Sequence, residues 1–297
     1  MSNAARRFPF VQVDVFTSQA LAGNPLAIFP DGRGLSGGEM LALAKEMNLA
    51  ETTFILPQDE ATEATRGKQV RIFTVQEELP FAGHPTLGTA FYLRGASGAK
   101  EVALDLKVGK VPVRFEDTPG QPVFGEMTQM SPEIGRFHDR EAVVRAAGLR
   151  DGDIDPSLPI QTVSTGVPFT IVPLRGLETM RDLQIDLKMS AEYLSRAGGK
   201  FFYFVCRETV DRGARLHARM LFYNGEDPGT GSAAGCTAAW MVANRVAQPD
   251  ERVLIEQGVE MGRPSQIYVR ASLKDDRVVN VRVGGNVVEV ARGEIYF

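Results

Sequence analysis

The side chains best suited to chemistry fall in three short stretches, and the first is centred on His84. Residues 81–90 lead from an apolar segment into Gly83 and then to Pro85, which suits the first turn of a helix. The free N–H groups of such a helix start attract an anion. His84 lies at this start, where an imidazole can donate to a carboxylate or move a proton near neutral pH. A purely structural histidine is the alternative interpretation.

The second stretch follows the same pattern, with a proline and glycines ahead of an expected helix start. Residues 226–235 contain Asp227, Pro228, three glycines and two hydroxyls, and they precede a run of small residues. No lysine follows at the spacing of a nucleotide phosphate loop, and no dinucleotide fingerprint is present. The alternative is that Asp227 is a helix N-cap and Ser232 a first-turn hydroxyl.

The third stretch, residues 47–54, places Glu51 at the head of an apolar, β-branched segment. A carboxyl group that is partly removed from water has a raised pKa, which suits a general acid or base near pH 7. A solvated surface glutamate is the alternative.

Together the three stretches predict one site. Two anion-binding helix starts and an acid between them are expected to face each other across a cleft between two lobes, a common location for small-molecule sites. The chemistry this indicates is proton transfer on a small carboxylate, without a metal or nucleotide cofactor. The three histidines, at 84, 138 and 217, have no metal-ligand spacing.

The elements that must position these residues are mostly short strands with a few helices. Ser36 and Glu39 have capping-box spacing at the start of the first helix. Helices are predicted at residues 37–47, 84–93, 140–147, 191–197 and 230–244. Strands are predicted at 10–16, 25–29, 52–56, 70–74, 102–115 (a hairpin turning at 109–110), 123–130, 160–163, 169–172, 201–206, 215–222, 253–256, 266–273, 278–283 and 287–290.

A weak internal repeat suggests two similar halves. Residues 23–28 resemble residues 166–171, and in each half a proline later opens a helix of small residues, at Pro85 and at Pro228. We expect an N-terminal lobe of residues 1–150 and a C-terminal lobe of residues 151–297. The linker is placed near 150–159, and a C-terminal strand could return to the first lobe. Chance similarity of glycine–proline turns is the alternative.

Composition excludes several classes. The chain is 43% hydrophobic and 24% charged, which is typical of a globular protein and not of a disordered one. Its net charge of −4 argues against nucleic acid as a partner. No segment is apolar enough for a membrane span or a signal peptide, so we expect a cytoplasmic protein with no membrane partner. Cys206 and Cys236 are expected to be buried, reduced thiols.

These motifs resemble the PhzF-like family of isomerases from phenazine biosynthesis, whose fold is related to that of diaminopimelate epimerase. The resemblance is carried by residues 13–17, 22–27, 47–54, 71–74, 78–89, 226–235 and 261–265. It implies an α+β fold of two pseudo-symmetric lobes, each a curved, mostly antiparallel sheet wrapped around a central helix. It also implies a homodimer.

The resemblance also implies an activity and a site. The phenazine enzyme isomerises trans-2,3-dihydro-3-hydroxyanthranilate to a ketone, and a glutamate that matches Glu51 moves the proton. His84 and Asp227 are expected to assist catalysis. The expected substrate-binding residues are Asn24, Gly83, Thr86, Gly229, Thr230, Gly231 and Ser232.

Two features of the chain depart from related proteins. Epimerases and racemases of this fold use two facing thiols, but neither cysteine of this chain falls at those places. Many family members carry a histidine where Phe169 stands, so the pocket is expected to be more apolar if this position touches the ligand.

We therefore predict a cofactor-independent isomerase acting on a small cyclic or amino carboxylate. The alternatives are a carboxylate-binding or scaffold protein with the same fold and little catalysis, and an amino-acid epimerase.

Overall fold

The computed structural model describes residues 6–223 and 225–297, which form two compact units. Unit 1 contains residues 6–127 and 285–297, and unit 2 contains Thr128–Gly284. The predicted boundary near 150–159 therefore lies inside unit 2, and the division differs from the predicted lobes of 1–150 and 151–297. Sequence composition indicated a loop near residues 150–159, whereas the pairing of the strands decides where the two units divide. No helix in the described ranges is long and apolar enough to cross a membrane.

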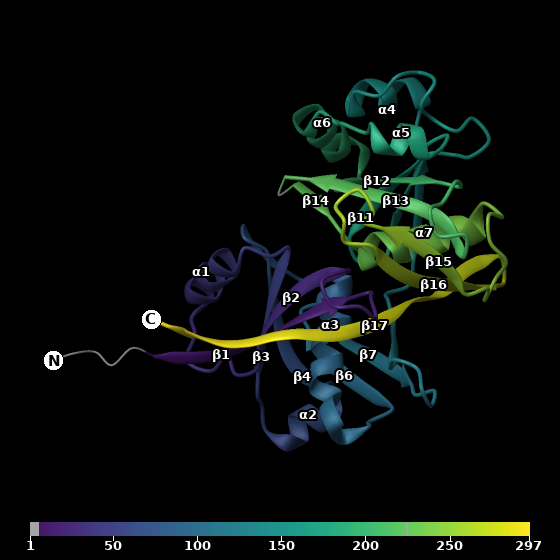
Figure 1. The fold of residues 1–297 in the computed structure, drawn as a ribbon. Helices are drawn as coiled ribbons and strands as arrows, with labels where there is room; N and C mark the ends of the chain where they lie inside the picture. Colours follow the sequence, from purple (N-terminus) through teal and green to yellow (C-terminus); the bar gives the residue numbers. More distant parts are fainter. Residues whose placement is uncertain (1–5, 224) are drawn as a thin grey trace. The chain divides into compact units, whose positions relative to one another are not determined.

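The described part of unit 1 combines parallel and antiparallel strands with three α-helices (Figure 1). Its elements are β1 (Arg7–Val15), β2 (Asn24–Phe29), α1 (Gly37–Met47), β3 (Glu51–Leu56), α2 (Glu60–Arg66), β4 (Lys68–Phe73), β5 (Glu78–Leu79), α3 (Gly83–Arg94), η1 (Gly95–Ser97), β6 (Glu101–Leu106), β7 (Gly109–Glu116) and most of β8 (Phe124–Thr128).

The described part of unit 2 also combines parallel and antiparallel strands, with four α-helices. Its elements are β9 (Glu133–Phe137), α4 (Arg140–Ala147), β10 (Gln161–Ser164), β11 (Pro168–Pro173), α5 (Leu177–Arg181), α6 (Leu187–Ala197), β12 (Phe201–Cys206), β13 (Ala214–Phe222), β14 (Gly225–Asp227), α7 (Gly231–Ala243), β15 (Val253–Gln257) and β16 (Ser265–Lys274). The last strand, β17 (Arg277–Tyr296), starts in unit 2 and ends in unit 1.

The two units repeat one pattern of strand pairing. In unit 1, β1–β2 is antiparallel, β2–β3 parallel, β3–β4 antiparallel, β4–β6 parallel and β6–β7 antiparallel, with β5 on β4. In unit 2, strands β10, β11, β12, β13, β15 and β16 pair in the same order and senses, with β14 on β13. The repeat predicted from short glycine–proline similarities is therefore present in the connectivity. In each unit the buried helix follows the short strand: α3 follows β5, and α7 follows β14.

Helix α1 confirms the predicted helix at residues 37–47. The Ser36 hydroxyl accepts from the Glu39 amide, and the Glu39 carboxylate accepts from the Ser36 amide at 2.7 Å. These two bonds satisfy N–H groups that the first helical turn leaves open. Met40 and Leu43 point into an apolar cluster that contains Phe29 and Phe54.

Helix α3 is buried on nearly all sides, which its small residues permit. It packs against β1, β2, β3, β6 and β7. At Gly88 the helix approaches the sheet so closely that an added Cβ would lie 2.7 Å from Leu26 Cδ2 and 2.9 Å from Val15 Cγ2. Helix α7 is likewise buried and packs against β10, β11 and β16. Both confirm the predicted buried helices, with ends shifted by one residue.

Several predicted element limits need correction. The strands predicted at 278–283 and 287–290 are one strand, because Gly284 and Gly285 continue the extended backbone instead of turning. Helix α6 begins at Leu187, where Asp186 caps it, and not at residue 191. The hairpin between β6 and β7 turns at Lys107 and Val108, since Leu106 pairs with Gly109. The short helices α2 and α5 were not predicted.

Substitution of Gly88 tests how tightly α3 is packed. We expect Gly88→Ala to lower the free energy of unfolding by about 1–3 kcal/mol, because the new methyl group must displace Leu26 and Val15. Gly38→Ala is the matched control, since its nearest neighbour would be 4.0 Å away and alanine favours a helix by about 0.5–1 kcal/mol. Urea unfolding measures both variants, and equal stabilities would contradict this account.

Candidate active site

The predicted acid Glu51 and the predicted histidine His84 lie together in unit 1. Glu51 is the first residue of β3, and His84 is in the first turn of α3. Glu51 Oε2 is 3.6 Å from His84 Nε2, and the two side chains are 16% and 3% exposed. The packing of α3 against β3 therefore brings a carboxylate and an imidazole together in a largely dry environment.

Asn24 completes this group from β2. Its Nδ2 lies 3.1 Å from His84 Nδ1. The ring also donates a hydrogen bond to the Pro25 carbonyl oxygen, so the Asn24 contact does not by itself decide which ring nitrogen carries the proton. Burial lowers the pKa of His84 to about 3, so the ring is neutral at pH 7. The structure thus joins Asn24, His84 and Glu51 in one polar group, which we call the Glu51 group.

The start of α3 differs in detail from what the sequence led us to expect. Its N-cap is Ala82, which has no polar side chain to bond the first-turn N–H groups. Gly83 and Thr86 are buried, and the Thr86 hydroxyl donates to the Ala82 carbonyl oxygen at 2.7 Å. The hydroxyl of Thr86 is therefore engaged within its own helix, and its role in substrate binding stays a prediction.

The second group lies in unit 2, where β14 ends at Asp227 and α7 begins at Gly231. The Thr230 hydroxyl donates to Asp227 Oδ2 at 2.5 Å. Asp227 is 7% exposed, so its carboxylate is nearly removed from water. The alternative that Asp227 is a simple N-cap does not describe it, because Thr230 occupies that position.

Gln257, which sequence reasoning did not select, holds this second group together. Its buried amide bonds the backbone of Asp227 and both the amide and the hydroxyl of Thr230. We call Asp227, Thr230 and Gln257 the Asp227 group. The turn after Gln257 also contacts it, because a Cβ on Gly258 would lie 2.5 Å from the Pro228 carbonyl oxygen. Gly229 and Gly231 are buried and Ser232 is half-buried in the same segment.

A buried charged cluster beside the Asp227 group was also missed. His217 Nδ1 is 2.8 Å from Glu256 Oε1, and its Nε2 is 3.0 Å from Glu260 Oε1. Burial alone would lower the pKa of His217, but the hydrogen bonds to the two carboxylates raise it to about 9. The ring is therefore charged at neutral pH. Local spacing could not reveal this cluster, because His217 and Glu256 are 39 residues apart.

The cysteines and Phe169 are core residues. Cys206 and Cys236 are buried and unpaired, as predicted, and burial raises the pKa of their thiols to about 12 and about 11. Both are therefore neutral thiols near pH 7. Phe169 is 2% exposed and packs against Phe201 and Tyr203.

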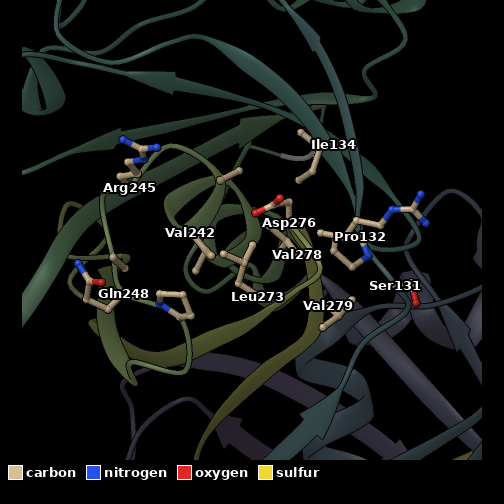
Figure 2. Close-up of a pocket in the computed structure, with 14 residues that line it drawn as sticks. Ser131, Pro132, Ile134, Val242, Arg245, Gln248, Leu273, Asp276, Val278 and Val279 are labelled. Carbon is tan, nitrogen blue, oxygen red and sulfur yellow. The ribbon is translucent and has the colours of Figure 1, made fainter.

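A cavity of about 1000 Å³ opens in unit 2, and none of the predicted site residues lines it. Figure 2 shows Val242, Leu273 and Val278 along it, with Arg245 and Gln248 to one side. Within residues 6–223 and 225–297, no group of three His, Cys, Asp or Glu side chains could hold a metal ion. The predicted chemistry thus rests on the Glu51 group and the Asp227 group. That they share one substrate stays a prediction.

Comparison with known proteins supports the resemblance read from the motifs. A sequence model of the family described as "Phenazine biosynthesis-like protein" matches residues 13–293. The chain belongs to this family. The match contains both the Glu51 group and the Asp227 group.

Individual relatives match almost the whole length of this chain. An uncharacterized isomerase of Mesorhizobium japonicum is 36% identical over 97% of this chain and 98% of the relative. A trans-2,3-dihydro-3-hydroxyanthranilate isomerase of Pseudomonas aeruginosa is 34% identical over 97% of this chain and 99% of that protein. The crystal structure of a Bacillus anthracis phenazine biosynthesis protein of the PhzF family has a TM-score of 0.88 at 25% identity and covers 98% of this chain and 100% of that one.

The predicted family and the α+β fold class are confirmed by these comparisons. The chain is an isomerase of this family, which confirms the predicted enzyme class. The roles of single residues do not follow from the similarity. They depend on the geometry described above.

The protonation of His84 is directly measurable. Because its pKa is lowered to about 3, its ring should stay neutral and not titrate between about pH 5 and 8. The pKa of His84 in the folded protein lies below the ordinary 6.5. Its contribution to folding stability is therefore fully present above pH 6.5 and is lost as the pH falls toward 3. Nitrogen-15 NMR, with His84→Asn for assignment, should show one neutral form of the ring across this range. A midpoint near 6.5 would show that burial does not control this ring.

His217 should give the opposite pH dependence. Its folded pKa of about 9 exceeds the ordinary 6.5, so its stabilisation is complete below about pH 6.5 and is lost as the pH rises through 9. We expect His217→Gln to cost about 3–5 kcal/mol at pH 6, because two buried carboxylates lose their cation. The difference from the unmodified protein should shrink toward pH 10. Urea unfolding across this range measures it, and a constant difference would exclude a charged His217.

Proposed function

We propose that this family member is an isomerase that moves a proton on a small cyclic carboxylate, with Glu51 as the acid and base. The observation that carries this proposal is the Glu51–His84 pair, with Glu51 Oε2 3.6 Å from His84 Nε2. Glu51 is 16% exposed, so it is largely dry but still reachable. Such a carboxylate is suited to take a proton from carbon and return it to another carbon.

His84 supports this chemistry as a neutral ring. Its Nε2 lies 3.6 Å from the Glu51 carboxylate, and its Nδ1 contacts the Asn24 amide. A neutral imidazole adds no positive charge beside the Glu51 carboxylate.

The proposed substrate is trans-2,3-dihydro-3-hydroxyanthranilate or a close analogue. The support is the Pseudomonas aeruginosa relative, whose name states this activity and which aligns over almost all of both chains. The free N–H groups at the start of α3, beside His84, are suited to a substrate carboxylate. We assign the Asp227 group an assisting role in hydrogen bonding.

The two alternative functions fit the described groups less well. A two-thiol epimerase needs a reactive thiolate, whereas Cys206 and Cys236 are buried thiols whose pKa is raised to about 12 and about 11. A pure binding or scaffold protein has no need of a carboxylate held against a neutral imidazole.

The finer architecture is also proposed. The repeated strand order supports two lobes related by pseudo-symmetry, each with a curved sheet around its buried helix, α3 or α7. A homodimer and a cytoplasmic location remain proposals that rest on the family resemblance.

Glu51→Gln tests the proposed function. The amide keeps the shape of the side chain but cannot take up a proton, so we expect kcat to fall by about 10²–10⁴-fold with little change in KM. The assay follows trans-2,3-dihydro-3-hydroxyanthranilate by absorbance and by proton NMR in D2O. Deuterium should enter the product only when Glu51 is intact.

Glu46→Gln is the matched control, because Glu46 is exposed in α1 of the same unit. It should retain full activity. Retention of most activity in Glu51→Gln would refute the role of Glu51. No turnover by the folded, unmodified protein would refute the proposed substrate.

A further inference from the structure

Gln257 ends β15 with a side chain that is completely buried. Its Oε1 accepts from the Thr230 amide at 3.0 Å and from the Tyr203 hydroxyl at 2.8 Å. Its Nε2 donates to the Asp227 carbonyl oxygen at 2.6 Å and to Thr230 Oγ1 at 2.9 Å. A primary amide has two N–H donors and two lone pairs, so every hydrogen-bonding position of Gln257 is used.

The orientation of this amide is fixed by its backbone partners. The Thr230 N–H can only donate, and the Asp227 carbonyl can only accept. Exchange of the amide nitrogen and oxygen would place donor against donor and acceptor against acceptor inside the protein. Unpaired buried polar groups are costly, so the amide is locked in one orientation.

The locked amide sets the direction of the next hydrogen bond. Thr230 Oγ1 accepts from Gln257 Nε2, and its single hydrogen points to Asp227 Oδ2, which is 2.5 Å away. A hydroxyl that donates to a carboxylate forms a strong, short bond. The series from Gln257 through Thr230 to Asp227 therefore holds one oxygen of the carboxylate in a defined place.

We propose that Gln257 is a positioning residue of the isomerase, which orients the Asp227 carboxylate through the Thr230 hydroxyl. Gln257 lies at the buried end of β15 and orders the segment from Asp227 to Thr230. The proposal rests on the assisting role assigned to Asp227 in the proposed function. It adds a residue that neither the motifs nor the family resemblance selected.

Two substitutions separate positioning from simple packing. Gln257→Glu keeps the shape but replaces the N–H donors with oxygen, so the Thr230 hydroxyl is drawn away from Asp227. Gln257→Met keeps a similar volume and removes all four bonds. The matched control is Gln161→Met, because Gln161 is a buried glutamine of the same unit whose amide bonds Gly135 and Asn244.

Turnover is the first measurement. Both Gln257 variants should lower kcat by about 10–100-fold, as loss of a group supporting a site residue commonly does, while KM changes little. Gln161→Met should reduce the melting temperature but keep kcat. Equal kcat in the Gln257 variants and in Gln161→Met would overturn the proposal.

The carboxyl carbon-13 resonance of Asp227, assigned with Asp227→Asn, is a second measurement that needs no substrate. It should move in both Gln257 variants and stay in place in Gln161→Met. An unmoved resonance in folded Gln257→Glu would overturn the positioning role, whatever the activity. A moved resonance in a protein that does not turn over the substrate would support the positioning role and refute the proposed function.

Discussion

Close packing of two helices built from small residues is the constraint on which both candidate groups depend. At Gly88 helix α3 lies so near β1 and β2 that a methyl group would clash with Leu26 and Val15. Helix α7 is constrained in the same way at Gly235, where an added Cβ would overlap the Gln129 side chain. This packing places the helix starts against strand ends, which brings His84 to Glu51 and the Thr230 N-cap to Gln257. A larger side chain along either helix would move these starts away from Glu51 and Gln257.

Both groups place an amide behind the side chain that meets a carboxylate. In unit 1 the Asn24 amide contacts the His84 imidazole, which in turn faces the Glu51 carboxylate. In unit 2 an amide donates to a hydroxyl, which donates to a carboxylate: Gln257, Thr230 and Asp227. In unit 2 every hydrogen-bonding position of the Gln257 amide is used, so this fixed amide determines the orientation of the groups beyond it. A buried amide can thus orient a carboxylate without a direct hydrogen bond to the carboxylate oxygens.

The repeated strand order explains why each unit has a helix start beside an acid. Units 1 and 2 share the same succession of antiparallel and parallel pairs, but their acids differ in place, since Glu51 begins β3 and Asp227 ends the short strand β14. Their surroundings differ as well. His84 is kept neutral by burial, whereas His217 of unit 2 is charged between Glu256 and Glu260. A duplicated scaffold thus carries two chemically distinct polar groups.

The sequence by itself determined the family, the enzyme class, helix α1 with its capping box, the two buried helices and the residues Glu51, His84 and Asp227 as candidates. These features depend on local patterns of a few residues, such as cap spacing and small-residue runs. Only the tertiary structure decided that Gln257 holds Asp227, that His217 lies between two glutamates and that the units divide at Met127. It also decided that β17 runs unbroken to pair with β1. Such contacts join residues that are tens to hundreds of positions apart in the sequence. They are selected by strand pairing and burial, which no local sequence pattern encodes.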